Sequence, residues 1–176
     1  MTKDSIALIG FMATGKSTVG NALKHRLGKD YQFIETDQII IEITGKSIPK
    51  IFVEEGEAKF RDYEHEACKR AARLKKKIIS CGGGVVLNES NIEILKQTCH
   101  MILLTATPEE IFNRVIREGK HNRPVINKND PFQEIKDVLQ YREAFYNSSA
   151  EIIIDTTGKS IEAIVEEILK HSKLRS

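Results

Sequence analysis

The sequence predicts an α/β protein in which a parallel sheet is covered by helices on both faces. Short apolar runs of strand length recur along the chain, and they alternate with segments whose apolar residues have helical spacing. Such alternation is typical of parallel strands joined through helices, which bury both faces of the sheet. With 176 residues, of which 40% are hydrophobic and 30% charged, the chain can form one compact domain with a packed core.

The expected strands are short runs rich in isoleucine and leucine, bounded by polar residues. Runs of this kind are typical of strands that are buried on both faces. They cover Ser5–Ile9, Tyr31–Ile34, Ile78–Ser80, Met101–Leu104 and Glu151–Ile154.

Helices are expected where apolar residues lie three or four positions apart, first over Lys16–Leu27 and last over Ile161–Leu169. Two further helix starts can be read from a capping residue followed by proline, at 107–110 and at 130–133. In the first of them, Thr107 is the expected N-cap and Glu110 is expected to close a capping box.

The overall charge and the cysteines exclude several classes of protein. The net charge is only +2, whereas an electrostatic nucleic-acid binder needs a large basic surplus. No apolar run approaches the roughly 20 residues that cross a bilayer, and the polar N-terminus does not resemble a signal peptide. Cys68, Cys81 and Cys99 have no metal-binding spacing and are expected to be reduced thiols. We therefore expect a cytoplasmic protein with no nucleic-acid or membrane partner.

The segment Gly10–Ser17 reads G-F-M-A-T-G-K-S and fits the phosphate-binding pattern G-x-x-x-x-G-K-[ST], between a strand and a helix. The glycines let backbone N–H groups wrap a phosphate, and the positive end of the following helix dipole faces the same anion. Lys16 would reach the β- and γ-phosphates, and Ser17 would offer its hydroxyl to Mg²⁺. The expected nucleotide-binding residues here are Gly10, Ala13, Thr14, Gly15, Lys16, Ser17 and Thr18.

Parts of this pattern recur elsewhere in the chain. Gly-Lys-Ser recurs at 45–47 and 158–160 without the first glycine, so Gly45 is expected to end a short helix and Gly158 to form a turn. The patterns N-K-x-D at 127–130 and D-x-x-G at 155–158 suggest a GTPase, but they stand in the reverse of the usual order. A GTP switch remains an alternative that a comparison of GTP and ATP affinity would test.

Glu35 and Asp37 follow the second expected strand, one residue apart. On a strand end, residues i and i+2 point the same way, which would turn both carboxylates toward the crevice at the carboxyl ends of the strands. One acid could then face the metal and the other a substrate hydroxyl. A solvated strand end is an equally simple reading of this pair alone.

Four more patterns occur further along the chain. They are I-F-x-x-x-G-E-x-x-F-R at 51–61, a glycine triplet at 82–84, Arg-Pro at 123–124 and R-x-x-x-Y at 142–146. Together with the phosphate loop and the acid pair, they make the chain resemble the shikimate kinase family over essentially its whole length.

The resemblance implies a three-layer P-loop kinase fold with a five-stranded parallel sheet in one domain, 1–176. It implies a helical substrate-binding region at about 36–65 and a mobile lid at about 118–130. The implied reaction is ATP-dependent phosphorylation of the 3-hydroxyl of shikimate, on the route to chorismate and the aromatic amino acids, by a monomer that uses Mg²⁺. A kinase for another small hydroxy acid, such as gluconate, is the alternative within the same fold.

The resemblance also implies roles for residues that bind the substrate. Asp37 would orient the reacting hydroxyl and accept its proton. Arg61 and Arg142 would hold the shikimate carboxylate, because a planar guanidinium can make two parallel hydrogen bonds to it. Gly83 and Gly84 would bring backbone against the substrate.

On the nucleotide side, the resemblance implies that Arg123 in the lid closes onto the transferring phosphate and that Arg117 lies near adenine. The implied catalytic residues are therefore Asp37, Lys16 and Arg123. The chain departs from the family at Glu35, where an aspartate is usual, so Glu35 is expected to bind Mg²⁺ through a water molecule. It departs again at Cys81, where a small hydroxyl residue is common, and in the short segment 156–160 near the adenine position.

Overall fold

The computed structural model describes residues 3–117 and 130–172. Its centre is a five-stranded sheet in the order β2-β3-β1-β4-β5, in which all neighbouring strands are parallel. This confirms the predicted sheet, and the predicted strand ends differ from the observed ones by no more than two residues. The strands are β1 (Ser5–Ile9), β2 (Gln32–Glu35), β3 (Lys77–Ser80), β4 (Cys99–Thr105) and β5 (Ile152–Asp155).

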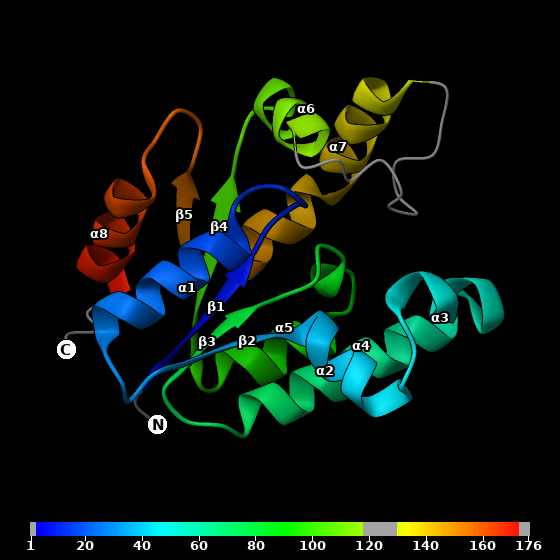
Figure 1. Cartoon of the computed structure of the whole chain (residues 1–176), viewed down its shortest axis with the longest axis horizontal. Helices are drawn as coiled ribbons and strands as arrows, with labels where there is room; N and C mark the ends of the chain where they lie inside the picture. The colour runs from blue at the N-terminus through cyan, green and yellow to red at the C-terminus, as the bar shows by residue number, and fades with distance from the viewer. Residues whose placement is uncertain (1–2, 118–129, 173–176) are drawn as a thin grey trace.

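Helices cover both faces of the sheet, as the sequence predicts (Figure 1). Alternate residues of the fully buried strand β1 supply two cores: Ile6 and Leu8 belong to the core on one face of the sheet, whereas Ala7 and Ile9 belong to the core on the other. The protein therefore has three layers. The covering helices are α1 (Lys16–Leu27) and α8 (Ile161–Ser172) on one face, and α4 (Gly56–Ala72), α5 (Glu89–Lys96) and α7 (Pro131–Ser149) on the other.

Two smaller apolar clusters support the elements at the carboxyl ends of the strands. In the first, α2 (Thr36–Thr44) and α3 (Ile48–Glu54) pack on α4 around Ile40, Ile51 and Phe60. Figure 1 shows α3 at the end of the molecule away from α8. In the second, α6 (Pro108–Arg117) and α7 enclose Phe11, which follows β1. A 3₁₀ turn, η1 (Val85–Leu87), follows the glycine triplet.

The helix start at Thr107 is confirmed only in part. Its hydroxyl accepts a hydrogen bond from the Glu110 amide at 3.2 Å, as an N-cap does. The second half of the expected capping box is wrong, because the Glu110 carboxylate accepts from Arg114 at 2.8 Å instead. The Thr107 amide donates to the Thr157 hydroxyl at 3.1 Å, so a loop 50 residues away takes over that role.

One other predicted helix start and one predicted helix end have the expected contacts. The Asp130 carboxylate caps α7 by accepting from the Gln133 amide at 3.0 Å. Gly45 ends α2 with its amide bonded to the Ile41 carbonyl at 2.8 Å. Both ends are therefore set by local sequence.

Cys68, Cys81 and Cys99 are buried, and none of them forms a disulfide. Within residues 3–117 and 130–172, every helix is too short or too polar to cross a membrane.

Candidate active site

The loop between β1 and α1 makes a tight turn against the neighbouring strand. Gly10 has φ of 140°, and a Cβ placed there would lie 2.3 Å from the carbonyl oxygen of Leu104. No other residue fits this position without moving β4, because the obstacle is backbone. Ala13 adopts φ of 57°, a left-handed conformation that is uncommon for a residue other than glycine. The backbone is thus bent around the start of α1, as a phosphate loop requires.

Lys16, the first residue of α1, places its charge over this loop. Its Nζ donates to the carbonyls of Gly10 and Phe11 at 2.8 and 2.7 Å. The Thr14 hydroxyl also donates to the Phe11 carbonyl, at 2.8 Å, and fixes the loop from within. A cation and the positive end of a helix dipole therefore act at the same place, which favours an anion.

Ser17 and Glu35 bring two oxygen groups together beside this loop. The Ser17 hydroxyl donates to the Glu35 carboxylate, although 18 positions separate the two residues. Hydroxyl and carboxylate oxygens suit Mg²⁺, which keeps several waters and often binds through substrate phosphates. Within the described part of the chain, no three His, Cys, Asp or Glu side chains gather into a metal site of their own. The pair therefore fits a magnesium ion held together with a nucleotide.

The acid pair lies at the crevice for a reason that differs from the predicted one. β2 ends at Glu35 and α2 begins at Thr36, so Glu35 and Asp37 do not share a strand. Asp37 instead lies in the first turn of α2. Thr36 between them is fully buried, and its hydroxyl accepts from the Gly82 amide at 2.9 Å. A contact with a distant loop thus accompanies the switch from strand to helix.

Charged side chains converge on the glycine triplet that follows β3. A Cβ on Gly82 would lie 3.1 Å from both Asp37 Oδ1 and Glu64 Oε1. A Cβ on Gly84 would lie 2.4 Å from Nη1 of Arg61. The absence of side chains at these positions is what lets two acids and an arginine approach the same stretch of backbone.

The arginine from α4 is oriented by a buried acid on the same helix. Arg61 Nη1 donates to Glu64 Oε2 at 2.8 Å, and the Glu64 side chain is 1% exposed. Burial raises the pKa of Glu64, Arg61 opposes that shift, and the Asp37 charge adds to it. Glu57, on the outer side of Arg61, is 64% exposed and accepts a second bond at 3.0 Å. The guanidinium is therefore held from two sides.

The second arginine comes from α7 together with a tyrosine one turn later. Arg142 Nη1 donates to the Gly83 carbonyl at 3.1 Å, and the Tyr146 hydroxyl donates to the same oxygen at 2.6 Å. Burial raises the pKa of Tyr146 to about 12, although the Arg142 charge opposes this. Tyr146 is therefore a neutral hydrogen-bond donor at ordinary pH.

Asp37, Arg61, Glu64, Arg142 and the glycine triplet line one cavity of about 460 Å³, together with most of the phosphate loop. Its lining combines the phosphate loop and the charged residues with an apolar wall formed by Ile48, Pro49, Phe52 and Phe60. A small polar molecule with a hydrocarbon ring would match such a lining. The predicted site residues that line it are Ala13, Gly15, Lys16, Ser17, Thr18, Glu35, Asp37, Arg61, Gly83, Gly84 and Arg142.

The other predicted site residues lie elsewhere. Gly10 and Thr14 are buried residues of the phosphate loop and do not line the cavity. Arg117 is exposed at the last position of α6 and does not line it either. Arg123 and most of the expected lid lie outside the described residues.

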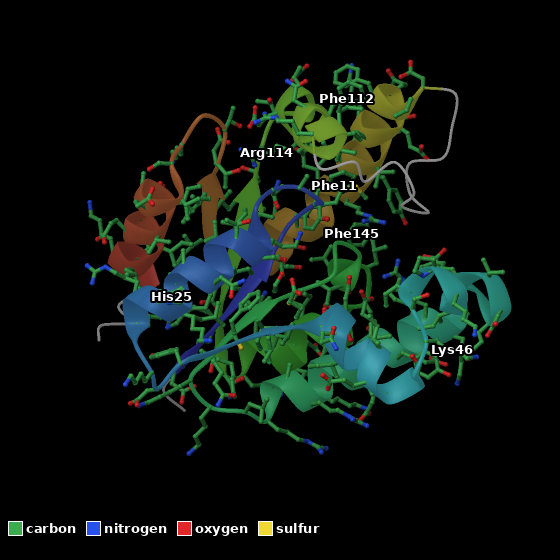
Figure 2. The ribbon with its side chains drawn as sticks, in the orientation of Figure 1. Phe11, His25, Lys46, Phe112, Arg114 and Phe145 are labelled. Atoms are coloured by element: carbon green, nitrogen blue, oxygen red, sulfur yellow. The ribbon has the colours of Figure 1, made fainter. Side chains whose placement is uncertain are left out.

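Sequence reasoning missed Arg114, which braces the phosphate loop from α6 (Figure 2). Its Nη1 donates to the carbonyl of Ala13 and to the hydroxyl of Thr156, each at 3.1 Å. The Thr156 side chain is buried and lies 3.2 Å from the Thr14 carbonyl. The only signal for Arg114 in the sequence is its i,i+4 spacing from Glu110, which is common on exposed helices. Glu64 and Tyr146 also lacked an assigned role.

Comparison with known proteins relates nearly the whole chain to one family. The family model described as shikimate kinase matches residues 12–173. The shikimate kinase of Pelotomaculum thermopropionicum is 41% identical over 169 residues, which cover 96% of this chain and 95% of that protein. The shikimate kinase of Caldanaerobacter subterraneus is 40% identical over 166 residues, 94% of each chain. The structure of shikimate kinase from Acinetobacter baumannii in complex with shikimate superposes with a TM-score of 0.88 at 32% identity, covering 96% of this chain and 92% of that one.

Proposed function

Since this chain belongs to the shikimate kinase family, we propose that its cavity transfers the γ-phosphoryl group of ATP to the 3-hydroxyl of shikimate. The products are ADP and shikimate 3-phosphate, an intermediate on the route to chorismate and the aromatic amino acids. One observation carries the proposal at the level of the site: the phosphate loop, Asp37 and two arginines converge on one cavity. Such a cavity can hold a nucleotide phosphate opposite an alcohol that carries a carboxylate.

The phosphate loop would hold the nucleotide. Its backbone amides and the start of α1 face the phosphates, and Lys16 can exchange its two carbonyl partners for phosphate oxygens. We propose that Ser17 and Glu35, the latter through water, hold Mg²⁺, which neutralises charge on the phosphoryl oxygens when bound. Glu35 is long enough to reach the Ser17 hydroxyl, so the replacement of the usual aspartate is compatible with this role.

Asp37 would act on the acceptor. Its carboxylate lines the cavity and lies next to Gly82, at the same end of the sheet as the phosphate loop. In the transfer, the shikimate hydroxyl oxygen forms a bond to the γ-phosphorus, and the bond from this phosphorus to the bridging oxygen of ADP breaks. The hydroxyl proton passes to Asp37. Because proton demand comes late in a loose transition state, aligning the hydroxyl is the larger part of this role.

Arg61 and Arg142 would hold the carboxylate of shikimate. They enter the cavity from α4 and α7, and the glycine triplet lies between them. A guanidinium can bind a carboxylate through two parallel hydrogen bonds, which fixes orientation as well as charge. The apolar wall at Pro49 and Phe52 would then contact the hydrocarbon side of the ring.

A coupled assay of ADP release with shikimate, gluconate and either ATP or GTP tests the function. We expect turnover with shikimate and ATP, and little with gluconate. Turnover of gluconate alone would reverse the choice of substrate. A strong preference for GTP would support the guanine-nucleotide alternative.

Further proposals concern the compartment, the oligomeric state and two arginines near the nucleotide. We propose that the enzyme acts as a cytoplasmic monomer, and the three buried cysteines without disulfides support a reducing compartment. Arg123 is proposed to contact the transferring phosphate. Arg117 is proposed to lie near adenine, although Arg114 is the arginine of α6 that contacts the phosphate loop.

A further inference from the structure

The glycine triplet is fastened at two successive residues by side chains from opposite parts of the fold. Thr36, at the start of α2, accepts from the Gly82 amide at 2.9 Å. Tyr146, on α7, donates to the Gly83 carbonyl at 2.6 Å. Both side chains are almost completely buried, with 0% and 4% exposure, so the side-chain partner of each bond is largely shielded from water.

The first bond links the triplet to the acid that faces the acceptor. Thr36 immediately precedes Asp37, and a Cβ on Gly82 would lie 3.1 Å from Asp37 Oδ1. The Gly82 amide therefore holds the first turn of α2 where Asp37 begins. If this bond is lost, the Gly82 amide loses its side-chain partner and the first turn of α2 can shift.

The second bond links the triplet to an arginine of the carboxylate site. Tyr146 follows Arg142 by one helical turn, so both side chains leave the same face of α7. They donate to one carbonyl oxygen, that of Gly83. This shared acceptor fixes the distance between α7 and the triplet, and with it the direction of the guanidinium.

We propose that Thr36 and Tyr146 are positioning residues that act on different steps of the reaction. Thr36 aligns Asp37 with the acceptor hydroxyl and therefore governs kcat. Tyr146 aligns Arg142 with the substrate carboxylate and therefore governs KM for shikimate. This inference rests on the proposed function, because it assigns the two effects to the acceptor and the carboxylate of the same substrate.

The test compares three conservative variants with two controls. Thr36→Val removes the hydroxyl at nearly constant shape, and Thr36→Ser keeps it. Tyr146→Phe removes only the phenol oxygen. Thr44→Val is the control on α2, because its hydroxyl bonds to the Ile40 carbonyl of its own helix. Tyr141→Phe is the control on α7, because Tyr141 is 66% exposed.

Steady-state kinetics and calorimetry of shikimate binding supply the readouts. One lost hydrogen bond of about 1.4 kcal/mol corresponds to about tenfold, so we expect Thr36→Val to lower kcat about tenfold while KM changes less than about twofold. Thr36→Ser should recover most of kcat. Tyr146→Phe should raise KM and the dissociation constant of shikimate about fivefold, with kcat nearly unchanged.

The outcomes separate this inference from the proposed function. An unaltered enzyme that does not turn over shikimate refutes the proposed function, and this inference falls with it. The positioning roles alone are overturned if the unaltered enzyme is active but kcat and KM change to the same extent in both variants. They are also overturned if these changes are no larger than in Thr44→Val and Tyr141→Phe.

Discussion

Arg61 Nη1 lies 2.8 Å from Oε2 of Glu64, three residues further along α4, and the acid is 1% exposed. An ion pair at a fully exposed position is worth little, whereas removing one partner of a buried pair leaves the other charge poorly compensated. Burial raises the pKa of Glu64, so the ionised form of this carboxylate carries a desolvation cost. The arrangement is therefore better explained by the direction it gives Arg61 than by its contribution to stability.

Replacing Glu64 by glutamine should loosen Arg61 and raise KM for shikimate. The amide retains the size of the side chain but loses the charge that attracts the guanidinium. We expect KM to rise about tenfold, in keeping with about 1.5 kcal/mol, the lower end for a hydrogen bond to a charged group, and kcat to change less. Glu57→Gln is the matched control, because Glu57 contacts the same arginine from an exposed position. Equal effects of the two substitutions would remove the special role of Glu64.

Replacing Asp37 by asparagine should abolish most turnover without loss of nucleotide binding. Asparagine keeps the size of the side chain but loses the charge and one acceptor oxygen, so the acceptor hydroxyl is held and aligned less well and its proton has no group to pass to. A general base of this kind contributes about 10²- to 10⁴-fold, so kcat should fall within that range. Calorimetry with a non-hydrolysable ATP analogue should give an unchanged dissociation constant. Turnover near the level of the unaltered enzyme would show that another group faces the hydroxyl.

Local signals were sufficient to predict much of the fold. The apolar run of β1, the spacing in α1 and the cap at Asp130 each depend on residues within a few positions of one another. The start of α2 was different: the hydroxyl of Thr36 is bonded to Gly82, 46 residues away. No local pattern contains that contact, which is why Glu35 and Asp37 were predicted to share a strand end.

Parts of the candidate site could be predicted where a sequence pattern has few other structural uses. The phosphate loop and the glycine triplet are patterns of this kind, and both line the cavity. Glu64 and Arg114 were missed because pairs spaced i,i+3 or i,i+4 are common on exposed helices. Only the tertiary structure shows that Glu64 is buried against Gly82 and that Arg114 reaches the carbonyl of Ala13.

Replacing Gly84 by alanine should impair substrate binding more than stability. The backbone of Gly84 has φ of −99°, which any residue can adopt, so the substitution adds little strain. The new Cβ would lie 2.4 Å from Nη1 of Arg61, the far end of a flexible side chain that can move aside. We expect KM for shikimate to rise at least about tenfold, because the guanidinium loses its alignment. The melting temperature and KM for ATP should change little, and a large loss of stability would show that Arg61 cannot move.

The three cysteines should resist alkylation in the folded enzyme up to alkaline pH. Burial raises the pKa of Cys99 to about 11 and raises those of Cys68 and Cys81 as well, so the reactive thiolate is scarce. In the unfolded chain a thiol ionises near pH 8.5, so the unfolded state loses protons that the folded state keeps. The contribution of these thiols to the free energy of unfolding is therefore present below about pH 8.5 and is lost as the pH rises toward the folded values. Mass spectrometry after iodoacetamide treatment at pH 8 should show no label on the native enzyme and three labels in urea. Rapid labelling of the native enzyme at Cys81 would instead indicate an accessible thiolate beside the glycine triplet.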